Sequence, residues 1–258
     1  MRHTDKKRTT VIAVCGKGGV GKTSISATLV RILSANSQNK VLAIDADPAV
    51  GLATALGIKV GKTVDDIRSD FIQQLESGNG ADKTDILTNL DYELFSALEE
   101  KQNLAFLAIG RPEKKGCYCK VNGILKDVIA SIVDNFDYVV IDGEAGIEQV
   151  NRRVMEKVSH LLLVSDASAK GLNVVKTISQ VASAAVNHER SGLILNRIRG
   201  REELELISIS PELNFLGWIP EDDTIRVCDI KGESILGLDD CPAIQATKEC
   251  MISMGLPV

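Results

Sequence analysis

The sequence has no excess of basic residues. It contains 30 lysines and arginines against 35 aspartates and glutamates, which gives a formal net charge of −5 and an isoelectric point near 5.4. Proteins that bind nucleic acids need a basic surface to neutralise the phosphate backbone. The charge balance therefore disfavours a nucleic-acid partner.

Long apolar runs are also lacking. A membrane-spanning helix takes roughly 18 or more consecutive apolar residues, and no segment offers them. The basic start MRHTDKKRTT leads into the short run VIAVC, which the polar segment GKGGVGKTS ends before it reaches the length of a signal peptide's apolar core. We therefore expect a cytoplasmic protein with no membrane partner.

Residues that commonly bind transition metals are few. The three histidines stand far apart in the chain and indicate no metal site. In a reducing compartment the six cysteines are more readily interpreted as free thiols or metal ligands than as disulfides. Only Cys117 and Cys119 have the spacing of a metal-chelating pair. The others are interpreted as small buried apolar residues, namely Cys15, Cys228, Cys241 and Cys250.

The sequence does contain a series of short apolar runs: VIAVC, KVLAID, LAFLAIG, YVVID, HLLLVSD, GLILN and FLGWIP. Such runs, alternating with segments of helical periodicity, are typical of parallel strands that are buried on both faces. The pattern predicts an α/β fold with one doubly wound, mostly parallel sheet of about seven or eight strands and helices on both faces. We expect a single domain over residues 1–258, for which an apolar content of 44% provides a sufficient core.

Two further helical segments are expected between the second and third of these runs. Residues 63–77 open with Thr63 and Asp66 near capping-box spacing, and residues 86–100 carry a leucine stripe that ends at Leu98. We expect them to form a helical elaboration over about residues 58–101. The segment with the two cysteines, residues 112–122, follows it.

The segment GKGGVGKTS satisfies the phosphate-binding pattern G-x-x-x-x-G-K-[ST]. It lies between a predicted strand and a predicted helix over residues 23–35, which is the context of a P-loop NTPase. Glycines let backbone N–H groups curl around phosphate oxygens, and the helix start adds the positive end of its dipole. Lys22 is expected to bridge the β- and γ-phosphates of ATP, and Thr23 to hold Mg²⁺. The nucleotide-binding residues predicted here are Gly16, Lys17, Gly18, Gly19, Val20, Gly21, Lys22, Thr23 and Ser24.

The stretch KGGVGKT, with a second lysine after the first glycine of the loop, resembles the deviant Walker A loop of the MinD, ParA and nitrogenase iron protein superfamily. The resemblance implies that Lys17 reaches across a homodimer to the nucleotide of the partner. A cation placed on developing phosphate charge acts as an arginine finger does, with effects on the order of 10³ to 10⁵ in rate. Taken alone, Lys17 would be a solvated loop lysine.

The same resemblance assigns residues beyond the loop. In AIDADPAVGLATALG, Asp47 corresponds to the aspartate that orients the attacking water and shares the Mg²⁺ shell, with Asp45 in a supporting role. In YVVIDGEAGIE, Asp142 corresponds to the Walker B aspartate that holds Mg²⁺, and the amide of Gly146 senses the γ-phosphate. The predicted catalytic residues are thus Lys17, Lys22, Asp47 and Asp142. Four positions after later strands correspond to residues around adenine: Asn196, Arg197, Pro220 and Glu221.

Two cysteine thiolates do not complete a coordination shell. Thiolates prefer ions such as Zn²⁺ and Ni²⁺, and two copies of Cys117 and Cys119 across a twofold axis would supply four sulfurs. If the segment is extended, alternate side chains point to one side and both sulfurs can face the axis. The pair also makes the chain similar to the CooC-type nickel-inserting ATPases. That resemblance implies an ATP-dependent metallochaperone with a nickel enzyme as its client, either carbon monoxide dehydrogenase or acetyl-CoA synthase.

Other branches of the superfamily fit less well. The segment DGEAGIEQVNRR contains no cysteine, which disfavours an electron-transferring iron protein, and Cys241-Pro242 lacks the second cysteine of the iron–sulfur scaffold ATPases. A MinD- or ParA-type positioning or partition ATPase remains the alternative. Its membrane-docking form needs a basic amphipathic C-terminal helix, and the tail CPAIQATKECMISMGLPV carries little charge. The sequence names neither the client enzyme nor the metal in service.

Overall fold

The computed structural model describes residues 8–76, 83–111, 119–143, 154, 158–185 and 188–258 of the chain. Its strands form one eight-stranded sheet in the order β3-β4-β2-β5-β1-β6-β7-β8. All neighbouring strands are parallel except β3 and β4, which are antiparallel. The strands are β1 (Thr10–Gly16), β2 (Val41–Asp45), β3 (Glu99–Lys101), β4 (Leu104–Ala108), β5 (Tyr138–Asp142), β6 (His160–Ser165), β7 (Arg190–Ile198) and β8 (Phe215–Pro220).

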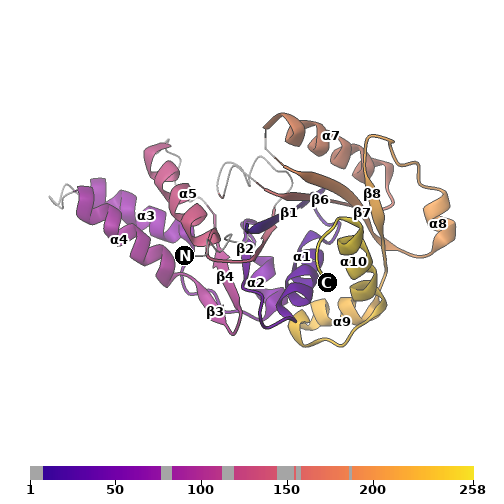
Figure 1. The fold of residues 1–258 in the computed structure, drawn as a ribbon, viewed down its shortest axis with the longest axis horizontal. Coiled ribbons are helices and arrows are strands. Elements are labelled where there is room, and N and C mark those ends of the chain that lie inside the picture. The colour runs from indigo at the N-terminus through magenta and orange to yellow at the C-terminus, as the bar shows by residue number, and fades with distance from the viewer. Residues whose placement is uncertain (1–7, 77–82, 112–118, 144–153, 155–157, 186–187) are drawn as a thin grey trace, which may run out of the picture.

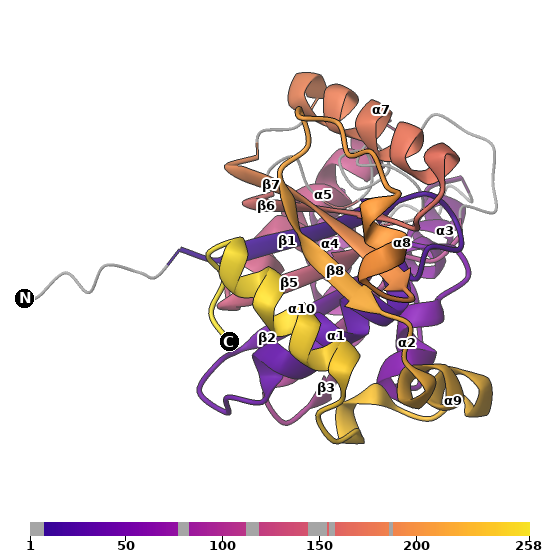
Figure 2. The same ribbon diagram turned by 90° about the vertical axis from the view of Figure 1, so that its right-hand side faces the viewer.

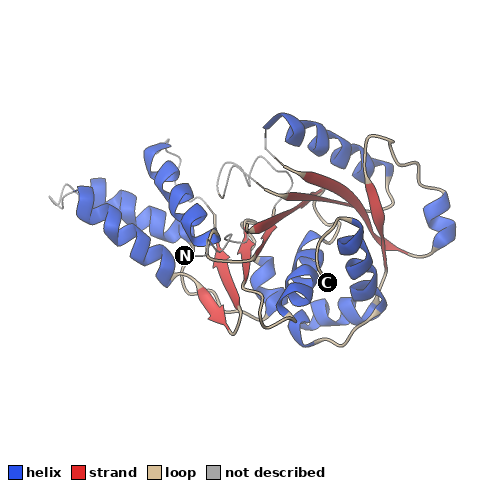
Figure 3. Ribbon diagram, viewed as in Figure 1, coloured by secondary structure: helices blue, strands red, loops and turns tan. Residues whose placement is uncertain are grey.

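Helices cover both faces of the sheet, which confirms the predicted fold class (Figures 1 and 3). Every residue of β2, β4, β5 and β6 is buried, because side chains on both faces of these strands pack against helices. Alternate residues of β1 divide between the two layers, so that Ile12 and Val14 pack into one core and Val11 and Ala13 into the other.

The first core lies under α1 (Lys22–Ser34), α2 (Gly51–Leu56), the 3₁₀ turn η1 (Ile235–Gly237) and α10 (Pro242–Ser253). The second lies under α3 (Val64–Glu76), α4 (Lys83–Ser96), α5 (Cys119–Val133) and α7 (Ala169–Ala185). Two short helices, α8 (Arg201–Glu205) and α9 (Asp223–Lys231), flank β8 in the sequence. Figure 2 shows α10 lying alongside β8.

The seven apolar runs predicted as strands are all strands. The eighth strand, β3, was not predicted because it is short and charged, as edge strands often are. Its first residues, Glu99 and Glu100, were expected to end the second helical segment. That prediction was wrong, since α4 ends at Ser96 and antiparallel pairing with β4 outweighs the helical spacing.

The first helical segment is confirmed as α3. Its start is a reciprocal cap, in which Thr63 N donates to Asp66 Oδ2 at 2.8 Å and Asp66 N donates to Thr63 Oγ1 at 3.2 Å. A further backbone bond joins this helix to the sheet, because Asp65 N donates to the carbonyl oxygen of Ile109 at 2.9 Å, directly after β4. The helical elaboration therefore begins at the carboxyl edge of the sheet.

Candidate functional site

The glycine-rich loop joins the carboxyl end of β1 to the start of α1 (Figure 1). Gly16 ends β1, and a Cβ there would collide with the carbonyl oxygen of Val164 in the neighbouring β6. Gly21 has φ 91°, a left-handed conformation that residues with a Cβ rarely adopt. Gly16 and Gly21 are therefore required by the course of the loop itself. Backbone N–H groups of such loops can bind an anion.

The two loop lysines have different surroundings. Lys22 is only 7% exposed, and its Nζ donates to the carbonyl oxygen of Lys17 at 3.3 Å. The Nζ of Lys17 lies 3.8 Å from Oδ2 of Asp166, directly after β6. The lysine that was expected to reach a second subunit thus has an acidic partner within its own chain, and this partner was not predicted from the sequence.

Two buried aspartates end neighbouring strands beside the loop. Asp142 is 1% exposed and accepts hydrogen bonds from Thr23 Oγ1 at 2.7 Å and Ser26 Oγ at 3.1 Å. Burial raises its pKa to about 6, although these hydrogen bonds and nearby Lys22 act in the opposite direction. Ser26 was not predicted, but it stands three residues after Thr23 on the same face of α1, a spacing that identifies it.

Asp45 is fully buried beside Asp142. It accepts hydrogen bonds from the backbone N–H groups of Leu52, at 2.8 Å, and Asp47, at 3.1 Å. Burial and the charge of Asp142 raise the pKa of Asp45 to about 7. The supporting role expected for Asp45 agrees with these contacts, because it anchors the turn that carries Asp47.

The oxygen atoms gathered here fit a magnesium ion. Mg²⁺ prefers hard oxygen ligands and is commonly held by one or two carboxylates plus phosphate and water. Thr23 and Asp142 already lie in contact, and the partly exposed side chain of Asp47 accepts a hydrogen bond from Ala49 N at 2.9 Å. A divalent cation would also offset the cost of burying two carboxylates. Thr23, Asp142 and Asp47 are therefore the residues that would hold it.

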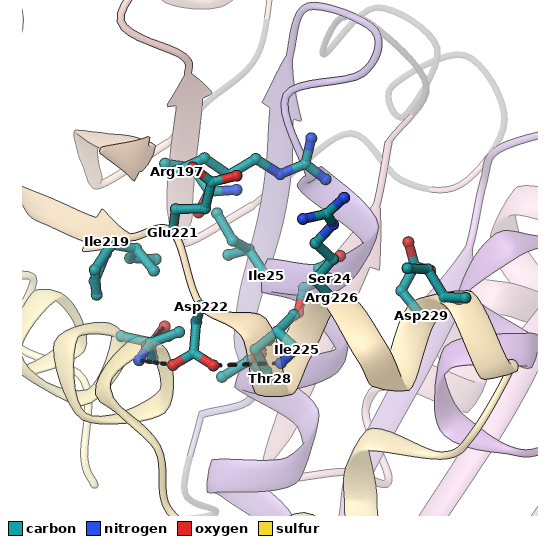
Figure 4. Close-up of a pocket in the computed structure, with 15 residues that line it drawn as sticks. Ser24, Ile25, Thr28, Arg197, Ile219, Glu221, Asp222, Ile225, Arg226 and Asp229 are labelled. Atoms are coloured by element: carbon teal, nitrogen blue, oxygen red, sulfur yellow. Dashed lines mark hydrogen bonds between the residues drawn. The ribbon is translucent and has the colours of Figure 1, made fainter. Parts of the chain in front are cut away.

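A pocket of about 400 Å³ opens beside the loop, between α1, the ends of β7 and β8, α9 and α10 (Figure 4). Its walls combine apolar and charged side chains, as nucleoside sites do. All four residues expected around adenine line it together with Ser24 of α1. The contribution of α9 and α10 to the pocket walls was not predicted from the sequence. These helices supply Ile225, Arg226, Asp229, Ile230, Ala243 and Thr247.

Asp222 fixes the position of α9 and α10 at this pocket. Its Oδ1 accepts from Thr224 N at 2.8 Å and caps α9, while its Oδ2 accepts from Ala243 N at 3.1 Å in α10. Burial alone would raise its pKa, but the hydrogen bonds to the ionised carboxylate hold the pKa below its ordinary value. The segment that was predicted to contact the base, at Pro220 and Glu221, is therefore followed directly by a residue that connects α9 to α10.

The side chains of Asn196 and Arg197 contact the loop as well as the pocket. Asn196 Nδ2 donates to the carbonyl oxygen of Val20 at 2.8 Å, and Arg197 Nη1 donates to the carbonyl oxygen of Gly19 at 3.3 Å. The side-chain amide of Asn196 was expected to face a purine, but one of its N–H groups already donates to the loop backbone. Arg197 has φ 61°, a conformation that costs a residue with a Cβ roughly 1 kcal/mol.

The cysteine pair is only partly described. Cys117, the amide of Gly146 and their surroundings lie outside the described residues, and Cys119 is the first residue of α5. Cys119 is therefore helical and not extended, and the conformation of Cys117 is not described. Within the described part of one chain, no three His, Cys, Asp or Glu side chains are grouped so that they could hold a metal ion.

The other four cysteines are buried and free, as predicted. Burial raises the pKa of Cys15 to about 12 and that of Cys250 to about 12. Thiols with such pKa values are poor metal ligands and poor nucleophiles at neutral pH. Burial also raises the pKa of Cys228 and that of Cys241. Cys117 and Cys119 therefore remain the candidates for binding a soft metal ion.

Comparison with solved structures shows the same fold over nearly the whole chain. The structure of a Cyanothece McdA variant in complex with ATP matches with a TM-score of 0.71 and 19% identity, covering 98% of this chain and 98% of that one. A chain of a MinC:MinD cell division protein complex from Aquifex aeolicus matches with a TM-score of 0.69 and 20% identity, covering 97% of each chain.

Sequence relatives agree with the fold. An uncharacterized ATP-binding protein of Methanocaldococcus jannaschii is 35% identical, with 89% of this chain and 92% of the relative covered. The carbon monoxide dehydrogenase accessory protein CooC of Rhodospirillum rubrum is 28% identical, with 88% and 89% covered. The septum site-determining protein MinD of Helicobacter pylori is 30% identical, with 92% and 86% covered. The model of the CobQ/CobB/MinD/ParA nucleotide binding domain matches residues 11–235, and the chain therefore belongs to this family.

Proposed function

We propose that this chain is an ATP-dependent metallochaperone. A homodimer would hold one Ni²⁺ or Zn²⁺ ion between its Cys117 and Cys119 pairs and hydrolyse ATP to support nickel insertion into carbon monoxide dehydrogenase or acetyl-CoA synthase. The observation that carries the proposal is this C-x-C pair, which leads into α5. The similarity to CooC supports it.

The nucleotide chemistry follows from the site at the carboxyl edge of the sheet. Lys22 and the loop amides would bind the β- and γ-phosphates, and Mg²⁺, when bound to Thr23, Asp142 and Asp47, would neutralise phosphate charge. Asp47 would orient a water molecule toward the γ-phosphorus, so that ADP and inorganic phosphate form. Lys17 of the second subunit would stabilise the charge that develops on the leaving oxygen.

A series of described contacts links this site to the helix that begins with Cys119. Ile109 N donates to the carbonyl oxygen of Asp45 at 2.8 Å, and Ile109 O accepts from Asp65 N in α3. One turn later, Arg68 is only 7% exposed and its Nε donates to Asn122 Oδ1 of α5 at 2.8 Å. The nucleotide site and α5 are thus joined through α3, which supports control of the metal site by the nucleotide.

Metal titration of the metal-free protein, with and without a non-hydrolysable ATP analogue, tests the proposal. Native mass spectrometry is expected to show one ion per two chains, lost in Cys117→Ser and in Cys119→Ser. Cys228→Ser is the matched control, since the Cys228 thiol donates to the carbonyl oxygen of Glu233 at 3.0 Å and a hydroxyl can replace it. One ion per chain without dimerisation would contradict the shared site.

The second candidate is a positioning or partition ATPase, which the similarity to MinD favours. MinD-type membrane docking uses a free amphipathic helix. In α10, five residues are buried against the core, and Lys248 pairs with Asp240, so the apolar face of this helix is already in use. Among the described residues no helix is long and apolar enough to cross a membrane. ATP-dependent flotation with liposomes or retardation of DNA would favour this candidate.

A further inference from the structure

Two adjacent residues of β7 hold two consecutive peptide groups of the phosphate loop. The bonds from Asn196 to Val20 O and from Arg197 to Gly19 O join residues that are 176 and 178 positions apart in the chain. The contact is close as well as polar, since a Cβ on Gly21 would lie 2.4 Å from Asn196 Nδ2. The phosphate loop therefore packs closely against the carboxyl end of β7, with no room for a side chain at Gly21.

The backbone of β7 is irregular where these side chains arise. Its pairing with β8 shifts register between Asn196 and Ile198, which leaves Arg197 as the extra residue of a bulge. The left-handed φ of 61° at Arg197 belongs to the same irregularity. Bulges of this kind turn a side chain in a new direction and occur beside active sites. Here the bulge lets consecutive residues, whose side chains alternate in a regular strand, reach the same loop.

The direction of the held carbonyls determines the direction of two N–H groups. In a planar trans peptide the C=O and N–H point to opposite sides. Because the carbonyls of Gly19 and Val20 point to Arg197 and Asn196, the N–H groups of Val20 and Gly21 are turned away from β7. These are backbone donors of the kind with which such loops bind phosphate oxygens.

We propose that Asn196 and Arg197 form a brace that orients loop amides for a phosphate ligand, so that Arg197 is a positioning residue rather than a contact of the purine. The two roles differ in the ligand they affect. A purine contact would act on every adenine nucleotide and not on pyrophosphate, whereas the brace acts on ligands with a β-phosphate. The proposal rests on the nucleotide site of the proposed function and is independent of its metal site.

The test compares the wild-type chain with Arg197→Gln, Arg197→Lys and the exposed control Arg201→Gln. Glutamine retains a Cβ and with it the backbone strain at this position, so the comparison isolates the guanidinium. Displacement of a fluorescent ADP analogue, with Mg²⁺ present, gives the affinities of ADP, AMP and pyrophosphate. We expect Arg197→Gln to weaken ADP and pyrophosphate about tenfold and to leave AMP within about twofold. Arg197→Lys is expected to recover part of the loss, and Arg201→Gln to behave as the wild type.

Amide hydrogen exchange of residues 17–23 in the nucleotide-free protein provides a second measurement. Loss of the brace is expected to increase exchange in this segment by about fivefold, with the rest of β1 and α1 unchanged. Equal weakening of AMP and ADP with unchanged pyrophosphate binding would overturn the proposal, and so would unaltered exchange in Arg197→Gln. If the wild-type chain binds no ADP, the nucleotide site of the proposed function itself is wrong.

Discussion

Asp45 and Asp142 lie opposite each other at the ends of the parallel strands β2 and β5. Both are buried, and burial raises both pKa values, to about 7 for Asp45 and about 6 for Asp142. Because both carboxyl groups resist ionisation, a Mg²⁺ ion held by Asp142 would compete with protons at this pair.

This pair predicts an unusual pH dependence in the metal-free protein. A carboxyl group with a raised folded-state pKa binds protons more strongly in the native than in the unfolded state. The contribution of this pair to the free energy of unfolding therefore decreases as pH rises from about 4 to about 7. Asp142→Asn removes one of these groups and lowers the pKa of Asp45, and is therefore expected to flatten the decrease. Urea denaturation in chelator between pH 4.5 and 7.5 measures both slopes. If the free energy of unfolding depended on pH equally in the wild type and in Asp142→Asn, the raised pKa of the pair would be contradicted. Mg²⁺ is expected to stabilise the wild type at pH 7.5 more than the variant.

A substitution of Asp47 separates binding from hydrolysis. The Asp47 side chain is partly exposed and stands beside the carboxylate pair, where it would orient water toward the γ-phosphate. Asp47→Asn is expected to keep the Kd for ATP within about threefold and to lower turnover by a factor of about 10² or more. Equilibrium binding and phosphate release measure the two effects, with the exposed Asp239→Asn as control. Unchanged turnover would remove the water-orienting role.

Arg68 gives a prediction for the connection between α3 and α5. Its guanidinium lies 3.9 Å from Asp65 Oδ1 and bonds to Asn122. Removal of one partner of a buried ion pair leaves an uncompensated charge and commonly costs about 3–5 kcal/mol. Arg68→Gln is therefore expected to lower the free energy of unfolding, and Arg68→Gln combined with Asp65→Asn to recover part of it.

The same substitution tests whether α3 positions α5 for the proposed metal site. We expect Arg68→Gln to weaken metal binding by the dimer about tenfold, while the Kd for ADP stays within about twofold, because no loop residue contacts Arg68 among the described interactions. Isothermal titration with Ni²⁺ and with ADP provides the two values. A loss of ADP affinity equal to the loss of metal affinity would indicate general damage to the fold.

The sequence predicts those features that depend on local patterns. Continuous apolar runs identify seven strands, most of which are buried on both faces. The glycine and lysine spacing identifies the phosphate loop because its chemistry lies in consecutive residues. The edge strand β3 has no such pattern, since pairing with β4 alone makes it a strand. Likewise Asp166 beside Lys17 and Arg197 beside Gly19 are brought together by strand order, which a single sequence does not reveal.

The position of Lys17 leads to a test of the dimer. Its Nζ lies near Asp166 of the same chain, whereas the proposed function places it on the nucleotide of a second subunit. Lys17→Gln is expected to keep ATP binding and to lose turnover by a factor of about 10³. Asp47→Asn is also expected to lose turnover, but there the missing group belongs to the nucleotide site of the same subunit.

A mixture of these two inactive proteins distinguishes the two arrangements. If Lys17 acts across the interface, a heterodimer contains one site with the Asp47 of one chain and the Lys17 of the other, because a twofold axis exchanges the two contributions. Random pairing then restores about a quarter of the wild-type turnover, since half of the dimers are mixed and each has one intact site. If Lys17 acts within its own chain, every site in the mixture lacks one of the two groups and no activity returns. Recovery should also disappear when Lys17→Gln and Asp47→Asn are placed in one chain and mixed with either single variant, because then no pairing can assemble both groups at one nucleotide.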